Sequence, residues 1–162
     1  MDDDPSYQIT ITFPDFGKAG ANAEPIGEEA IQTAIAACLR GHSVRQARLG
    51  VAIVDDTTIA DLNQTHLSHE GPTDVITFDM SDKADGQLIE GEIIMSGQTA
   101  AREAAVRGHD TADELALYAV HGVLHLLGYD DHQPEDARRM HEMEDEILTS
   151  IGFGRVYGAI HE

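Results

Sequence analysis

The sequence predicts an α/β (α+β) fold, in which a small mixed four-stranded sheet packs with about five helices in a single domain. Three observations lead to this prediction. Segments with strand and helix periodicity follow one another in the order β-α-β-α-β-β-α-α-α, the 162 residues suffice to bury a core without disulfides, and no internal repeat is present. We therefore expect residues 1–162 to form one domain.

The first half of the chain alternates strands with helices. Residues 7–13 alternate apolar and polar side chains, which predicts a half-buried strand, and residues 31–39 place apolar side chains at helical spacing. Residues 49–54 form an uninterrupted apolar run, which is typical of a strand buried on both faces. A short helix is expected to follow this strand at residues 57–64.

The second half of the chain predicts two further strands and then three helices. The strands span residues 75–78 and 89–95, and a polar segment with the composition of a turn separates them. The helices span about residues 97–107, 112–127 and 134–150; a glycine follows each of the first two, and a proline begins the third.

The helix at residues 112–127 carries the most informative pattern. Thr111 and Glu114 match a capping box, in which two side chains satisfy backbone donors at the start of a helix. Apolar residues cover most of the helix circumference, which predicts burial on nearly all sides. His121 and His125 lie within this apolar setting.

These two histidines predict a metal site. Residues four apart lie on one helical face with Cβ atoms roughly 5–6 Å apart, so the imidazoles of His121 and His125 can converge on one ion. Gly128 can turn the chain back, and His132 follows it as the third ligand. Three protein ligands leave a position for water, which is the arrangement of a catalytic zinc ion.

A different interpretation of the same histidines is that they belong to the core. In that case His121 and His125 would be satisfied by hydrogen bonds alone, and His132 would be a surface residue. Burying an imidazole without a hydrogen-bonding or metal partner costs free energy. In addition, a third histidine, His132, follows the turn expected at Gly128. These two points favour the metal site, with one Zn²⁺ ion.

Composition restricts the function classes. The formal charge of −20 repels phosphate backbones and anionic membranes, so a role with nucleic acid must overcome it. No apolar run approaches the roughly 18 residues of a membrane span, and no signal peptide is apparent. The only cysteine, Cys38, lies on the apolar side of a helical segment and is expected to be a buried hydrophobe. We expect a soluble cytoplasmic protein.

Three blocks of the sequence resemble the YbeY family, which are metal-dependent endoribonucleases of bacterial rRNA maturation. The first block is the string HGVLHLLGYD at residues 121–130. The second joins residues 62–63 (LN) to residues 72–78 (PTDVITF), and the third joins residues 91–94 (GEII) to residues 102–104 (REA). Together the blocks have consistent spacing, and we regard them as highly specific.

This resemblance implies a fold, a cofactor and a function. It implies a mixed α/β fold with one Zn²⁺ ion held by three histidines, which are His121, His125 and His132 in this sequence. It also implies an endoribonuclease that cleaves single-stranded rRNA in 3′-end maturation of the small-subunit rRNA and in ribosome quality control. The implied partners are rRNA and components of the small ribosomal subunit, with neither DNA nor a membrane.

The sequence departs from the family pattern at two positions. Asp131 occupies the position of the third histidine, so either one extra residue brings His132 to the metal or Asp131 replaces it. We favour His132, because imidazole suits zinc and a loop absorbs one inserted residue. Leu67 stands where the family usually has an arginine that assists at the phosphate; His66 and His69 lie nearby.

Two other functions remain as alternatives. A ribosome-assembly factor with a mainly structural zinc ion would fit the net charge and Leu67. A zinc protease is disfavoured, because the residue after the first histidine, which is the general base in His-Glu-x-x-His enzymes, is Gly122 here. Asp130, Asp131 and Glu92 are weak candidates for a base, since acidic residues in so acidic a chain are usually solvated.

Overall fold

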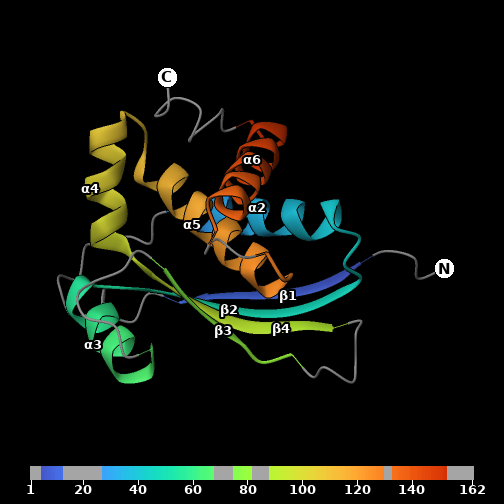
Figure 1. The fold of residues 1–162 in the computed structure, drawn as a ribbon, viewed down its shortest axis with the longest axis horizontal. Helices are drawn as coiled ribbons and strands as arrows, with labels where there is room; N and C mark the ends of the chain where they lie inside the picture. Colours follow the sequence, from blue (N-terminus) through green and yellow to red (C-terminus); the bar gives the residue numbers. More distant parts are fainter. Residues whose placement is uncertain (1–4, 13–26, 68–74, 82–87, 130–132, 153–162) are drawn as a thin grey trace.

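Four strands form one mixed sheet in the order β1-β2-β4-β3 (Figure 1). A computed structural model of the chain describes residues 5–12, 27–67, 75–81, 88–129 and 133–152, and the side chains of residues 65–67 are not described. Strands β1, β2 and β4 run parallel, and β3 runs antiparallel to β4, which confirms the predicted mixed sheet. The strands are β1 (Ser6–Thr12), β2 (Gln46–Val54), β3 (Val75–Asp79) and β4 (Leu88–Ser96).

Helices cover the two faces of the sheet unequally. Figure 1 shows α2, α5 and α6 on one side of the sheet and α3 on the other. The bounds agree with the expected helices to within a few residues, and no helix in the described ranges has the length and hydropathy to cross a bilayer. The helices are α2 (Glu28–Gly41), α3 (Asp56–Leu67), α4 (Gly97–Arg107), α5 (Thr111–Leu126) and α6 (Pro134–Ser150).

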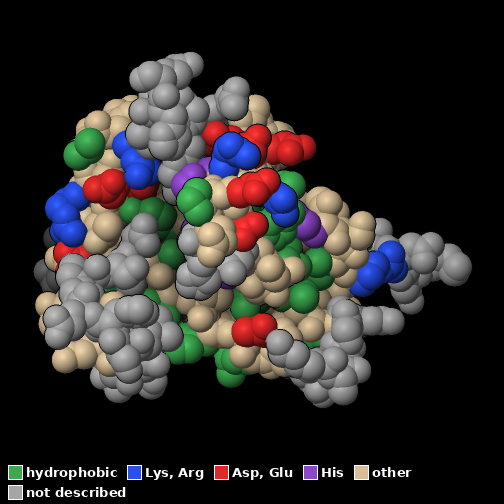
Figure 2. All heavy atoms as spheres, viewed as in Figure 1, with side chains coloured by type: hydrophobic (Ala, Val, Ile, Leu, Met, Phe, Trp, Pro, Cys, Tyr) green, Lys and Arg blue, Asp and Glu red, His purple; other side chains and the backbone are tan. Residues whose placement is uncertain are grey.

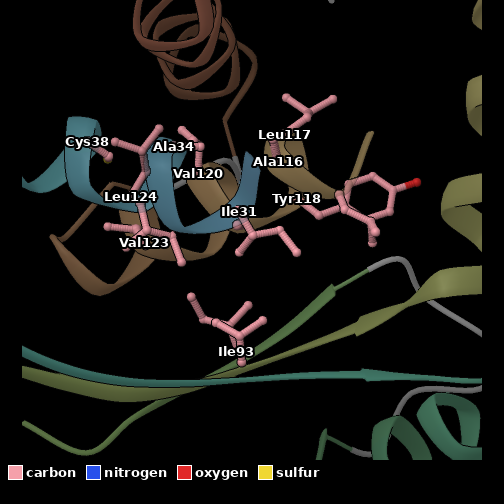
Figure 3. Close-up of a cluster of buried hydrophobic side chains, with 14 of the residues drawn as sticks. Ile31, Ala34, Cys38, Ile93, Ala116, Leu117, Tyr118, Val120, Val123 and Leu124 are labelled. Atoms are coloured by element: carbon pink, nitrogen blue, oxygen red, sulfur yellow. The ribbon is translucent and has the colours of Figure 1, made fainter. Parts of the chain in front are cut away.

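Helix α5 lies at the centre of the main core and close to the sheet. It contacts α2, α4 and α6 as well as strands β3 and β4. Ile93 of β4 points from the sheet toward the layer of α2 and α5 (Figure 3). A Cβ on Gly122 would meet three side-chain carbons of Ile93 at 3.0 to 3.2 Å. The close approach of α5 to the sheet therefore favours glycine at this position.

The opposite face of the sheet is only partly covered. Helix α3 packs Ile59 against Val54 and Ile76 at one end of this face. Burial therefore alternates along β2, and Gly50 and Ala52 are only half-buried. The expectation that residues 49–54 are buried on both faces was wrong for this reason, since no helix of the described residues covers the rest of the face.

The start of α5 differs from the predicted capping box. Asp110 is the N-cap residue and makes no side-chain capping hydrogen bond. The carboxylate of Glu114 instead accepts hydrogen bonds from Arg107 Nη1 at 2.9 Å and from His109 Nε2 at 2.5 Å. Glu114 is fully buried, so these two donors from the end of α4 and the following connection replace solvent around it. The helix begins where expected, but the capping-box interpretation was wrong.

Candidate metal centre

The imidazoles of His121 and His125 converge, as their spacing on α5 predicts. Their Nε2 atoms lie 3.1 Å apart, and the ring planes are nearly perpendicular, at 84°. Two nitrogen ligands of a tetrahedral zinc ion, each about 2.0–2.1 Å from the metal, are about 3.3 Å apart. The observed separation is therefore close to that of two ligands of one ion.

Glu144 of α6 contacts the ring of His121. The Nδ1 of His121 lies 2.5 Å from the Oε2 of Glu144, and the Glu144 side chain is fully buried. Burial raises the pKa of Glu144, and the hydrogen bond from His121 acts in the opposite direction. When Nδ1–H donates to this carboxylate, the lone pair of the neutral imidazole is on Nε2, the atom that faces His125.

A backbone carbonyl orients the ring of His125. Its Nδ1 lies 3.1 Å from the carbonyl oxygen of Tyr129, which can only accept, so Nδ1 carries the hydrogen. Gly128 has φ +105°, in the left-handed region that favours glycine, and it turns the chain after α5 so that Tyr129 lies beside His125. The Nε2 of His125 therefore also presents a lone pair.

The donor set fits a metal ion. Two Nε2 lone pairs 3.1 Å apart repel each other unless a cation, either a metal ion or a proton, lies between them. A carboxylate or carbonyl on the far nitrogen of each imidazole is the usual support of metal-bound histidines. Both imidazoles are half-buried, so solvent reaches part of each residue.

A third ligand is not found among the described residues. No group of three or more histidine, cysteine, aspartate or glutamate side chains there could hold an ion. His132, Asp131 and Asp130 all lie outside the described residues, which resume at Gln133. The choice between His132 and Asp131 as third ligand stays a prediction.

The structure removes Glu92 from the candidate bases. Glu92 is exposed, and its carboxylate lies over Gly50 on the face of the sheet opposite α5. The sheet therefore separates Glu92 from His121 and His125. Leu67 and His66 lie in the last turn of α3, where their side chains are not described, and His69 lies outside the described residues.

Sequence reasoning missed Glu144 as a partner of the site. The residue lies among acidic neighbours on α6, and a carboxylate in so acidic a chain is usually solvated. A signal was nevertheless present, because Met140, Ile147 and Leu148 share its helical spacing and are all buried. A carboxylate on the apolar stripe of a helix needs a partner from another element.

The surface near α6 mixes charges of both signs. Figure 2 shows acidic and basic side chains interspersed in this region, with histidine atoms visible between them. On the face that Figure 2 shows, the described residues form no continuous basic tract. This agrees with the net charge of −20 and indicates that positive side chains alone do not attract RNA to this face.

Comparisons with known proteins give a consistent family. Residues 20–152 match the family model described as Endoribonuclease YbeY. Endoribonuclease YbeY of Moorella thermoacetica is 38% identical over 144 residues, which cover 81% of this chain and 92% of the relative. Endoribonuclease YbeY of Corynebacterium kroppenstedtii is 38% identical over 147 residues, which cover 85% of this chain and 71% of the relative.

A solved structure has the same fold. The solution structure of a Thermotoga maritima protein superimposes with a TM-score of 0.57 at 20% identity, covering 96% of this chain and 97% of that protein. The similarity supports the mixed α/β architecture that the sequence predicts.

Proposed function

The chain belongs to the YbeY endoribonuclease family, and on this premise we propose that it is a metal-dependent endoribonuclease that cleaves single-stranded RNA. The proposed substrate is small-subunit rRNA, in 3′-end maturation and ribosome quality control in the cytoplasm. One observation carries the metal dependence: the Nε2 atoms of His121 and His125 face each other at 3.1 Å while both Nδ1 atoms are engaged elsewhere.

His121, His125 and His132 are proposed to hold one Zn²⁺ ion. When bound, the ion supplies a Lewis acid for the phosphate and lowers the pKa of a coordinated water toward about 7. Glu144 and the Tyr129 carbonyl engage the two Nδ1 atoms, which leaves the two Nε2 atoms to face the proposed ion. The nucleophile is water or the 2′-hydroxyl of the RNA, and a 2′,3′-cyclic phosphate product identifies the second.

The first experiment compares metal content and RNA cleavage in wild type, His121→Ala and His109→Gln. We expect one zinc ion per chain in wild type, and loss of both zinc and cleavage in His121→Ala. His109→Gln is the control, because its amide can still donate to Glu114 while an imidazole is removed outside the site. Cleavage by His121→Ala or by chelator-treated protein at the wild-type rate contradicts the proposal.

A second comparison assigns the third ligand. His132→Ala is expected to lose the metal and Asp131→Ala to keep it, because neutral imidazole suits zinc better than a carboxylate. The reverse result would identify Asp131 as the ligand. Both variants are checked for an unchanged thermal unfolding transition of the metal-free protein, so that loss of metal is not confused with loss of fold.

A ribosome-assembly factor with a mainly structural zinc ion is the second candidate function. The net charge of −20 favours it, because weak attraction to free RNA suits a protein that associates through ribosomal proteins. Under this function, His121→Ala lowers zinc content and stability but leaves association with the small subunit intact, and wild type does not cleave RNA.

Incubation with an unfolded protein substrate tests the protease alternative, for which we expect no cleavage.

A further inference from the structure

We propose that Glu144 is a positioning residue of the metal centre: from α6 it holds the imidazole of His121 so that its Nε2 faces the Nε2 of His125. The inference rests on the proposed function, since it assigns a role to Glu144 only if the two histidines bind a metal. It adds to the site a residue that supplies no ligand atom.

The contact joins two helices at a buried point. Glu144 Oε2 lies 2.5 Å from His121 Nδ1, the Glu144 side chain is 0% exposed, and that of His121 is 17% exposed. His121 is held by a side chain of another helix, whereas the Nδ1 of His125 contacts the nearby Tyr129 carbonyl. Packing of α6 against α5 therefore decides where the Nε2 of His121 points.

Burying the carboxylate of Glu144 in the core costs free energy. Its helical neighbours Met140, Ile147 and Leu148 are buried and apolar, so an apolar residue would continue their stripe without desolvating a charge. The second oxygen, Oε1, accepts no hydrogen bond from the described residues. A buried carboxylate with one unsatisfied oxygen destabilises the fold unless a positive charge nearby compensates it.

A metal ion on the far side of the imidazole would add positive charge to that of His141, which lowers the pKa of Glu144 against the effect of burial. A carboxylate that accepts a hydrogen bond from a metal-bound histidine fixes the ring orientation and makes its other nitrogen a stronger donor to the metal. Glu144 is therefore expected to stabilise the metal-loaded protein more than the metal-free protein. A purely structural carboxylate would stabilise both forms equally.

The chain contains a matched structural pair. Glu114 is also 0% exposed and also lies 2.5 Å from a histidine nitrogen, Nε2 of His109. Both of its oxygens are paired, since Arg107 donates to the second one at 2.9 Å. Glu114 lies on α5 seven residues before His121, roughly 10 Å along the helix axis. It is a buried Glu–His pair outside the metal centre.

The test compares Glu144→Gln, Glu144→Leu and Glu114→Gln in the full chain. Zn²⁺ affinity is measured by competition with a chelator, and stability is measured by thermal unfolding of the metal-free protein. We expect Glu144→Gln and Glu144→Leu to lower the Zn²⁺ affinity about 10- to 100-fold. The metal-free unfolding temperature of Glu144→Gln should be unchanged or higher, because a buried charge is removed while the amide oxygen can still accept from His121 Nδ1.

The control should behave in the opposite way. Glu114→Gln is expected to lower the unfolding temperature, because it weakens a buried ion pair with Arg107, and to leave the Zn²⁺ affinity within about twofold of the wild-type value.

Nitrogen-15 NMR of the metal-free protein gives a second readout. The hydrogen of His121 should be on Nδ1 in wild type and should move to Nε2 in part of the Glu144→Leu molecules.

The outcomes separate this inference from the proposed function. If both Glu144 variants bind Zn²⁺ as wild type does while His121→Ala does not, Glu144 has no positioning role and the proposed function stands. If Glu144→Gln lowers stability as Glu114→Gln does and leaves affinity unchanged, the role is structural and the inference is overturned. If wild type binds no Zn²⁺ through His121, the proposed function fails and the inference fails with it.

Discussion

The Nε2 of His42 accepts a hydrogen bond from the hydroxyl of Tyr129, with 2.9 Å between the two atoms. His42 is the C-cap residue of α2, and its Nδ1 donates to the carbonyl oxygen of Cys38 at 2.8 Å. Tyr129 in turn offers its carbonyl oxygen to His125. The end of α2 therefore supports the orientation of a histidine on α5, although the two helices are far apart in sequence.

Tyr129→Phe should weaken the metal centre as well as the fold. It removes the hydrogen bond to His42, so we expect the free energy of unfolding to fall by about 1 kcal/mol. The carbonyl of residue 129 is then less firmly held, and Zn²⁺ affinity should fall. Urea unfolding and chelator competition measure the two effects.

The matched control for this change is Tyr7→Phe. The Tyr7 hydroxyl donates to the carbonyl oxygen of Val44 at 2.6 Å, so this hydrogen bond joins the start of β1 to the residues before β2 and involves neither histidine of α5. The stability loss should be similar, but Zn²⁺ affinity should be unchanged. Equal affinities for both variants would show that the His42–Tyr129 contact does not support the site.

Gly122→Ala should destabilise the protein by about 1–3 kcal/mol, because its Cβ would lie 3.0 to 3.2 Å from three side-chain carbons of the fully buried Ile93, which would have to shift to make room. The added methyl pushes α5 away from β4 between the two histidines, so Zn²⁺ affinity should fall as well. The cost of Gly122→Ala should shrink in an Ile93→Ala background, which a double-mutant cycle by urea unfolding measures.

Gly41→Ala provides the control for helix glycines. Nothing lies within 4 Å of a Cβ added at Gly41, the last residue of α2. Alanine there should leave the free energy of unfolding unchanged or raise it by up to about 1 kcal/mol, because it reduces the entropy of the unfolded chain. A similar loss in Gly41→Ala and Gly122→Ala would contradict the packing explanation.

The contribution of Asp56 to stability should depend on pH. Burial raises the pKa of Asp56, but hydrogen bonds from Ser96, Arg102 and Thr99 outweigh burial and hold the pKa below its ordinary value. A carboxyl whose pKa is lowered by folding stabilises the fold above its unfolded pKa, about 3.9, and loses that effect as pH falls through its folded pKa.

The free energy of unfolding of wild type should therefore be higher than that of Asp56→Asn, and this difference should be largest near neutral pH. The difference should shrink between about pH 4 and the lower folded pKa, since protonation removes the charge that Arg102 binds at 2.8 Å. Urea unfolding of both proteins across this range is the measurement. A difference that does not change with pH would contradict the ion pair.

Cys38 should be unreactive in the folded protein. It is fully buried, and burial raises the pKa of its thiol to about 12, with the charge of Glu144 adding to the effect. A thiol reagent at about pH 8 should modify it only after unfolding in denaturant, as followed by mass spectrometry. Modification of the native protein at the rate of a free cysteine would show that α2 opens readily.

Helix α5 shows which features of the structure the local sequence pattern predicts and which it does not. Its apolar circumference and the spacing of His121 and His125 predicted a buried helix with two converging imidazoles, and the structure has both. The capping box at Thr111 and Glu114 was wrong, because Arg107 and His109 compete successfully for the carboxylate. The local sequence pattern could not predict these contacts of Glu114, because they depend on the path of the chain between α4 and α5.

The sequence alone determined the order of strands and helices, the face of α5 that carries the histidines, and the family, because helix and strand periods and motif spacing are local properties. Only the tertiary structure decided which groups support the imidazoles. Glu144 and His42 come from α6 and from the end of α2, and neither is recognisable by local sequence pattern as a partner of this site. A carboxylate becomes a buried hydrogen-bond acceptor only when another element excludes water from it, and that depends on packing between helices distant in sequence.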